Sequence, residues 1–166
     1  MVVNPPTVGV ARFWIVSSFM STFSTDPQKL EELLNYCTEF ARQMIRENGE
    51  FHPFGAVIDS NGQLMAVGAS AGEVIPEEAE LYGFLQNSMK SQFLNGEIVA
   101  CAIAANVNLP AQLESRFPDG IRVLVECAGY SRFNYLPYAI SGERVEYGEF
   151  ISVDVPATIC PGGDEA

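Results

Sequence analysis

One segment, Ile98 to Val107 (IVACAIAANV), is almost continuously apolar and is built from small residues. A strand with one face in water alternates apolar and polar side chains, whereas a strand covered on both faces shows no such alternation. The segment therefore predicts a central strand with other elements packed above and below it. Such a strand would give a three-layer arrangement with the sheet in the middle.

The segment from residue 26 to residue 49 predicts an amphipathic helix. Asp26 provides a capping carboxylate, and Pro27 occupies the first helical position, where proline is tolerated. Asn48-Gly49 ends the helix through a left-handed cap. The apolar residues between these ends recur at spacings of three and four, which places them on one face. They are Leu30, Leu33, Leu34, Cys37, Phe40, Ala41, Met44 and Ile45.

A second helix is predicted from Pro76 to Asn95-Gly96. Its inner face is expected to carry Leu81, Phe84, Leu85, Met89 and Phe93. The glutamates Glu77, Glu78 and Glu80 occupy its first turn, where the helix dipole favours anions. The same carboxylates could instead share a catalytic site or provide oxygen ligands for a divalent cation.

The other strand segments are rich in β-branched and aromatic residues and are bounded by turn residues. They are Phe54 to Asp59, Gln63 to Ala69, Ile121 to Gly129, Phe133 to Ile140 and Val145 to Val153. Asn61-Gly62 joins the first pair as a hairpin turn, and Ser141-Gly142 joins the last pair. Pro137 interrupts its segment and predicts an edge strand or a bulge there. The predicted fold is α+β, a single domain with a mainly antiparallel sheet of about five to six strands and two main helices packed on it.

The length and composition fit one folded domain. The chain has 166 residues, which leaves room for one domain of ordinary size. Its 48% apolar content supports a packed core and excludes an intrinsically disordered chain. We divide the chain into an N-terminal arm at residues 1–25, an α+β domain at residues 26–155 and an acidic, glycine-rich tail at residues 156–166.

The charge balance argues against two classes of partner. Nine basic residues against 21 acidic residues give a net charge of −12 and a pI near 4.3. Nucleic-acid binders concentrate Lys and Arg against phosphates, and anionic membranes attract basic surfaces. We therefore expect neither a nucleic acid nor a membrane as partner. A negative surface favours a protein partner that is itself basic, and pairing through an edge strand would give a homodimer.

Histidine and cysteine are scarce and scattered in the sequence. The single histidine, His52, excludes zinc motifs that need two histidines, and the four cysteines form no Cys-x-x-Cys pair. The chain contains no P-loop and no Gly-x-Gly-x-x-Gly segment after a strand. We expect no metal and no cofactor. The cysteines predict buried free thiols in a reducing compartment, the cytoplasm. They are Cys37, Cys101, Cys127 and Cys160.

Four residues are candidates for catalysis: His52, Ser70, Glu78 and Glu80. Gly68-Ala69-Ser70-Ala71-Gly72 matches the Gly-x-Ser-x-Gly pattern of a nucleophile elbow and follows a predicted strand. The predicted helix does not follow the serine directly, which favours a turn of small residues instead. His52 could act as a general base, or it could cap the end of a strand as an ordinary loop residue.

The segment Tyr130 to Tyr138 (YSRFNYLPY) gathers aromatic residues around one arginine. Tyrosine and arginine are frequent in binding hot spots, and an edge strand with a proline could receive a partner. The tyrosines could equally pack over a face of the sheet. The candidate binding residues are Tyr130, Arg132, Phe133, Tyr135 and Tyr138.

Pro53-Phe54-Gly55-Ala56-Val57-Ile58 is followed by the Asn-Gly hairpin, a second strand and Glu78-Ala79-Glu80 on a helix. This order, over roughly a third of the chain, resembles the opening of the zinc-dependent nucleobase and nucleoside deaminases. In that family a Pro-[Phe/Val]-Gly-Ala-Val strand precedes His-Ala-Glu or Cys-Ala-Glu. The first residue of that triplet binds zinc, and its glutamate moves protons.

Two departures from the deaminase pattern decide what the resemblance implies. Glu78 stands where the family has His or Cys. The sequence Pro110-Ala111-Gln112-Leu113-Glu114 stands where the family has Pro-Cys-x-x-Cys. A tetrahedral zinc site needs those ligands, so the resemblance implies the scaffold of the family without its zinc chemistry. The chain is also similar in pattern to short bacterial α+β proteins, which implies no activity.

Three functions follow as hypotheses. The first is an acidic, non-catalytic binding or regulatory protein that acts through its surface. The alternative is a metal-independent, hydrolase-like enzyme on a deaminase-like or other α+β scaffold, which would use the four candidate catalytic residues. The third is a small-ligand module with a pocket beneath the second helix. The absence of metal ligands, a P-loop and an ordered triad from the sequence favours binding over catalysis.

Overall fold

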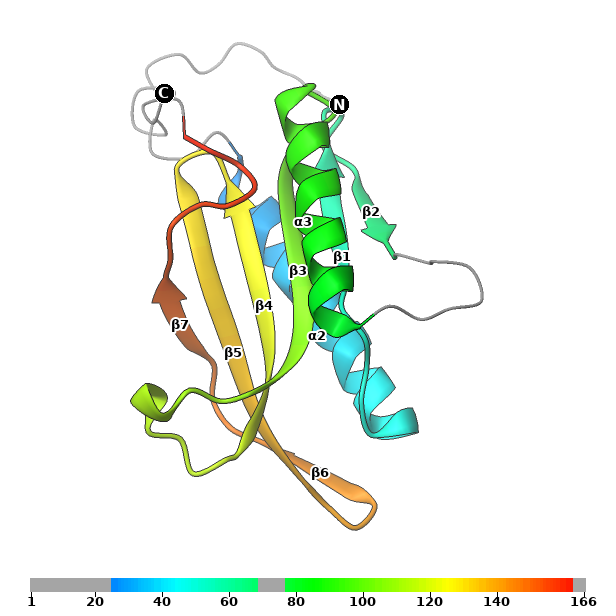
Figure 1. The fold of residues 1–166 in the computed structure, drawn as a ribbon, viewed down its shortest axis with the longest axis vertical. Helices are drawn as coiled ribbons and strands as arrows, with labels where there is room; N and C mark the ends of the chain where they lie inside the picture. Colours follow the sequence, from blue (N-terminus) through cyan, green and yellow to red (C-terminus); the bar gives the residue numbers. More distant parts are fainter. Residues whose placement is uncertain (1–24, 69–76, 163–166) are drawn as a thin grey trace.

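The computed structural model describes residues 25–68 and 77–162 of the chain. In these ranges the fold is α+β, with two helices and one antiparallel sheet (Figure 1), which confirms the predicted fold class. The elements in chain order are α2 (Pro27–Asn48), β1 (Phe54–Asp59), β2 (Leu64–Val67), α3 (Glu78–Leu94), β3 (Ile98–Asn108), the short 3-10 helix η1 (Ala111–Leu113), β4 (Asp119–Cys127), β5 (Tyr130–Ser141), β6 (Arg144–Tyr147) and β7 (Ile151–Asp154).

Helix α2 forms as its sequence predicts. The Asp26 carboxylate accepts a hydrogen bond from the backbone N–H of Gln28 at 2.9 Å, so it satisfies a donor that has no partner within the helix. Gly49 follows the helix with a φ of 80°, a left-handed conformation that glycine adopts without strain. The apolar side of α2 packs on one face of the sheet through buried residues such as Leu33 and Cys37.

The strands follow the order β2-β1-β3-β4-β5, and both β6 and β7 pair with β5 at the far edge. In the described part of the chain the sheet has seven strands, because the segment predicted as one strand from Val145 to Val153 forms two. The chain turns away from β5 at Gly148, whose N–H donates to the Pro137 carbonyl at 2.8 Å. As a result, β6 pairs with the end of β5 and β7 pairs with its beginning.

Pro137 lies within β5, opposite the gap between β6 and β7. The N–H and C=O groups of one residue point to the same side of a strand, and the Pro137 carbonyl points toward Gly148. The missing N–H of the proline therefore faces the gap, and no hydrogen bond between strands is lost. The prediction of an edge strand or a bulge at Pro137 is corrected: β5 has neighbours on both sides, and the proline marks a change of partner strand.

The sheet is the middle layer of three, as the apolar segment Ile98 to Val107 predicts. Ala102 of β3 belongs to the core beneath α2, whereas Cys101 and Ile103 belong to the core beneath α3. The two helices therefore cover opposite faces of the sheet. Helix α3 lies over β1 and β3, and of the two helices in the described residues neither covers β4 and β5 on this face (Figure 1). We refer to the two faces as the α2 face and the α3 face.

Helix α3 packs on the sheet through Leu81, Leu85 and Met89, which are buried as predicted. The sequence also predicts Phe84 on this inner side, but its side chain is 62% exposed. Successive residues of an α-helix are rotated by about 100° around the axis. Residue 84 therefore falls on the flank of the buried stripe and not beneath it.

The cysteines and the C-terminal segment complete the core. All four cysteines are buried and none of them forms a disulfide, which confirms the prediction of buried thiols. Residues 156–162, which are predicted from the sequence to be part of a tail, lie against the sheet, and Ile159 and Cys160 are fully buried. We call residues 155–162 the strap.

Within the described ranges, no helix has both the length and the apolar character that a membrane-spanning helix needs.

Candidate functional site

The predicted catalytic residues lie around the N-terminus of α3 and the start of β1. The Nδ1 atom of His52 is 3.8 Å from Oε1 of Glu78, and the two side chains are 54% and 56% exposed. This distance is beyond hydrogen-bonding reach, and water screens an exposed pair of this kind. Glu77 and Glu80 are also exposed, and Ser70 lies outside the described residues. The fold gives His52 a carboxylate neighbour but leaves both groups in solvent.

The predicted binding residues of β5 divide between the two faces of the sheet, because side chains alternate along a strand. Tyr130, Arg132 and Tyr138 lie on the α2 face, and Phe133 and Tyr135 lie on the α3 face. Tyr135 is 6% exposed and Tyr138 is 3% exposed. These two tyrosines therefore pack in the interior and do not form an exposed strip.

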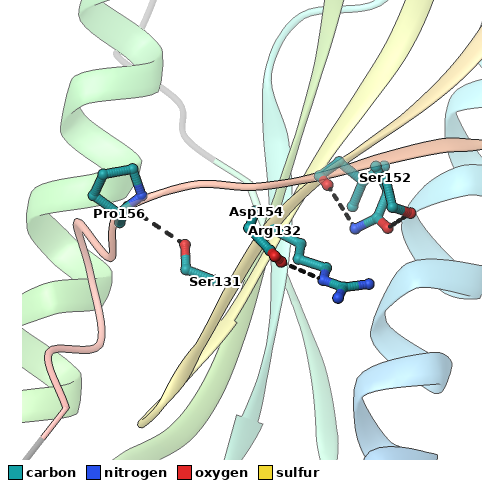
Figure 2. A network of polar contacts seen from close by, with 7 residues as sticks. Ser131, Arg132, Ser152, Asp154 and Pro156 are labelled. Atoms are coloured by element: carbon teal, nitrogen blue, oxygen red, sulfur yellow. Dashed lines mark hydrogen bonds and ion pairs between the residues drawn. The ribbon is translucent and has the colours of Figure 1, made fainter.

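Polar contacts along β5 hold β7 and the strap in place (Figure 2). The Nε atom of Arg132 donates to the Asp154 carboxylate at 2.6 Å, and the Ser131 hydroxyl donates to the Pro156 carbonyl at 3.5 Å. Ser152 extends this network along β7. The hydrogen bond to Asp154 raises the pKa of Arg132. Arg132 is therefore engaged in joining two strands.

The strand register brings a different arginine to the α3 face. Ala105, Arg122, Tyr135 and Ile151 are cross-strand partners and form one row across β3, β4, β5 and β7. The next row on this face contains Ile103, Leu124, Phe133 and Val153. Arg122 therefore stands as a cation among apolar and aromatic side chains.

Two aromatic rings contact the guanidinium group of Arg122. Its Cζ atom lies 4.3 Å from the ring centroid of Phe133 and 5.2 Å from that of Tyr82 on α3. Both distances lie within the range of cation–π attraction. Such contacts leave the N–H donors of the guanidinium available for hydrogen bonds. We call Arg122, Tyr82, Phe133 and Tyr135 the Arg122 site.

Two polar atoms of the Arg122 site are buried and have no hydrogen-bond partner among the described residues. They are Nε of Arg122 and the hydroxyl oxygen of Tyr82. An unsatisfied buried polar group costs about 1–3 kcal/mol. Burial raises the pKa of Tyr82, against the opposing effect of the Arg122 charge, so the phenol keeps its proton at neutral pH. The site therefore presents a guanidinium N–H and a phenol, which can both donate to an anion.

The nearby carboxylate of Glu126 is already engaged and does not neutralise Arg122. Its side chain is fully buried and accepts hydrogen bonds from the backbone N–H groups of Thr158, Ile159 and Cys160 at 2.9–3.2 Å. No described residue forms an ion pair with Arg122. Among the described residues, the Arg122 guanidinium therefore has aromatic rings and no carboxylate as its charge partners.

Neither Arg122 nor Tyr82 is among the site residues predicted from the sequence. Arg122 is the one basic residue of β4, whose other charged residues are Asp119 and Glu126, and a cation in a strand predicted to be buried is a signal that could have found it. Tyr82 gives no comparable signal, because its position depends on how α3 crosses the sheet. Phe133 and Tyr135 are the two predicted binding residues that the fold brings to the site.

A hollow of about 420 Å³ lies elsewhere, at the tip of the β5–β6 hairpin. It is lined by Ser141, Arg144, Val145 and Glu146. None of the predicted site residues lines it, so we do not assign a function to it.

The described ranges contain no group of three or more histidine, cysteine, aspartate or glutamate side chains placed to hold a metal ion. Comparisons with protein-family models, with curated proteins and with solved structures found no match. The resemblance to the deaminases and the choice between binding and catalysis therefore stay predictions.

Proposed function

We propose that this protein is a binding protein that recognises an oxyanion, a carboxylate or a phosphate group, at the Arg122 site. The observation that carries the proposal is the buried Nε–H of Arg122, which lies against aromatic rings and has no hydrogen-bond partner among residues 25–68 and 77–162. The strongest partner for a donor on a permanent cation is a negatively charged oxygen.

The surroundings of Arg122 favour an acid with an apolar body. The half-buried ring of Phe133 lies against Arg122, and Ile151 and Val153 of β7 continue the apolar surface beside it. Small-molecule sites typically combine apolar and aromatic contact area with a few polar groups that fix orientation. An aromatic carboxylate or an aryl phosphate would place its oxygens near Arg122 and Tyr82 and its ring on this surface.

This proposal combines two hypotheses drawn from the sequence, the non-catalytic binding protein and the ligand module beneath the second helix. A basic protein partner stays a separate prediction, which rests on the net charge of −12. The metal-independent enzyme stays the alternative, with His52 and Glu78 as the two candidate groups that lie near each other.

Observing the Nε–Hε signal of Arg122 by NMR during a titration tests the proposal. We expect benzoate or phenyl phosphate to shift this signal at millimolar concentrations, and we expect the uncharged benzyl alcohol to leave it unchanged. The two anions distinguish a carboxylate site from a phosphate site. The variant Arg122→Gln should weaken binding at least about tenfold, because it removes a charge-assisted hydrogen bond.

The variant Arg132→Gln is the matched control for charge. Arg132 lies on the opposite face of β5 and is already paired with Asp154, so its loss should leave the affinity unchanged. If Arg132→Gln weakened binding as much as Arg122→Gln, the anions would be responding to overall charge, and the proposal would be wrong. It would also be wrong if neither anion shifted the Arg122 signal.

A further inference from the structure

Polar contacts at one end of β4 and the buried side chains of Ile159 and Cys160 hold the strap to the sheet. The Glu126 carboxylate accepts three backbone N–H groups of the strap and also the Thr158 hydroxyl, at 3.0 Å. Gln86 of α3 donates to the Thr158 hydroxyl at 3.3 Å, and the Val155 N–H donates to the Ser131 carbonyl at 3.1 Å. The strap forms no strand of the sheet, so it can open locally while the strand pairing of the domain stays intact.

The strap places one thiol directly against another. The Sγ atoms of Cys101 on β3 and Cys160 on the strap are 3.8 Å apart, and neither residue is exposed. A disulfide has an S–S length of about 2.05 Å, so the two sulfur atoms must approach by roughly 2 Å. The two residues are separated by 59 positions in the chain. A bond between them would therefore join the strap to the central strand of the sheet.

The other two cysteines lie on the far side of the sheet. Cys37 on α2 and Cys127 on β4 belong to the core beneath α2, whereas Cys101 and Cys160 belong to the core beneath α3. The fold therefore brings one particular pair together and keeps that pair apart from Cys37 and Cys127.

We propose that Cys101 and Cys160 are an oxidation site, at which a peroxide converts the two thiols into a disulfide that fastens the strap to β3. This proposal is independent of the Arg122 site. While the strap is closed, the hydrogen bond with Cys160 and burial raise the pKa of Cys101 well above its ordinary value, so the closed pair is protected. Opening of the strap exposes Cys160, and the reaction begins there.

The reaction takes two steps. The Cys160 thiolate attacks one oxygen of hydrogen peroxide, the O–O bond breaks, hydroxide leaves, and Cys160 becomes a sulfenic acid. When the strap closes again, the Cys101 sulfur attacks the Cys160 sulfur and the S–O bond breaks. Water leaves with the proton of Cys101. In total, two thiols lose two electrons and two protons, and hydrogen peroxide is reduced to two molecules of water.

Mass spectrometry of the full chain after exposure to hydrogen peroxide tests the proposal. Remaining thiols are alkylated in denaturant, and the protein is digested without reduction. We expect two alkylated cysteines, Cys37 and Cys127, and one cross-linked peptide pair containing Cys101 and Cys160. The variant Cys160→Ser should abolish this cross-link, and Cys37→Ser, the matched control on the other face, should leave it unchanged.

The rate of oxidation tests the role of the strap. Gln86→Ala removes one hydrogen bond to the strap without touching a cysteine, and we expect it to raise the rate of disulfide formation about fivefold. Glu126→Gln removes a charged acceptor and should raise the rate further, provided that its circular dichroism shows a folded domain. Gln86→Ala serves as the test if Glu126→Gln does not fold.

Three results would overturn the proposal. The first is a cross-link that involves Cys37 or Cys127. The second is loss of all four thiols at one rate, which would indicate oxidation through global unfolding. The third is oxidation of Cys160 to a sulfinic acid with no link to Cys101.

Discussion

At the scale of single residues, Gly55 on β1 has no room for a side chain. A Cβ atom there would lie 2.5 Å from the carbonyl oxygen of Ala102 and 2.6 Å from Cε of Met89. The methionine end can rotate away, but the carbonyl is fixed by the pairing of β1 with β3. We expect Gly55→Ala to lower the free energy of unfolding by about 1–3 kcal/mol, measured as a lower urea midpoint.

Gly83 on α3 provides the control for this substitution. A Cβ atom at Gly83 would have no neighbour within 4 Å, and alanine is favoured over glycine inside a helix by about 0.5–1 kcal/mol. Gly83→Ala should therefore raise the urea midpoint. A loss of stability of the same size at both positions would show that the close contacts of Gly55 are not its cause.

Residue patterns predict buried positions better than they predict sites. Cys37 and Met89 are identified by local spacing alone, because a helix packed on a sheet repeats its buried side every three or four residues. The position of Arg122 depends on the register of four strands and on the crossing of α3. Those relations join distant parts of the chain, so no local pattern contains them.

At the scale of elements, the start of α2 depends on one capping contact. Asp26 accepts the Gln28 N–H at 2.9 Å, and loss of such a cap costs about 1 kcal/mol. We expect Asp26→Ala to lower the urea midpoint accordingly, whereas Asp26→Asn should retain most of the stability because asparagine also caps helices. Equal losses in the two variants would show that the capping hydrogen bond does not contribute.

The strap is a second element whose contribution can be measured. Ile159 is fully buried although the sequence places it in a tail, and truncation of a buried isoleucine to alanine costs about 2–5 kcal/mol. We expect Ile159→Ala to lower the free energy of unfolding by that amount. Ile140, which is 48% exposed, gives a matched control, and Ile140→Ala should cost much less. Similar costs in the two variants would mean that the burial of Ile159 does not stabilise the fold.

Sequence reasoning predicts which elements exist more reliably than it predicts where they change partner. The helix over residues 27–48 and the strands β1 and β3 carry their signals locally. The break between β6 and β7 has no such local signal. It occurs where Gly148 turns away from β5 beside the ring of Phe117, and a Cβ atom at Gly148 would lie 2.9 Å from that ring. Phe117 and Gly148 are far apart in the sequence, so their contact cannot be predicted from either segment.

At the scale of the whole molecule, the three layers follow from the apolar central strand, because a strand with two apolar faces has to be covered on both. The same burial determines how the molecule responds to alkaline pH. Burial raises the pKa of Cys37 from 9.0 to about 12, and it also raises the pKa values of Tyr138 and Tyr147. These groups keep their protons in the folded state at a pH where the unfolded chain has already lost them.

The sign of the pH dependence follows from this difference in bound protons. Below a pH of 9.0, the ordinary pKa of cysteine, the Cys37 thiol is protonated in both states, and its burial contributes fully to stability. Above that pH the unfolded state binds fewer protons than the folded state, so the free energy of unfolding falls by up to about 1.4 kcal/mol per pH unit until the folded pKa is reached.

We expect the urea midpoint to decrease between about pH 9 and pH 10. Cys37→Ala should begin from a lower midpoint and show a shallower decrease over that range, because it removes the thiol that titrates. An identical slope in both proteins would show that Cys37 does not drive the alkaline loss of stability.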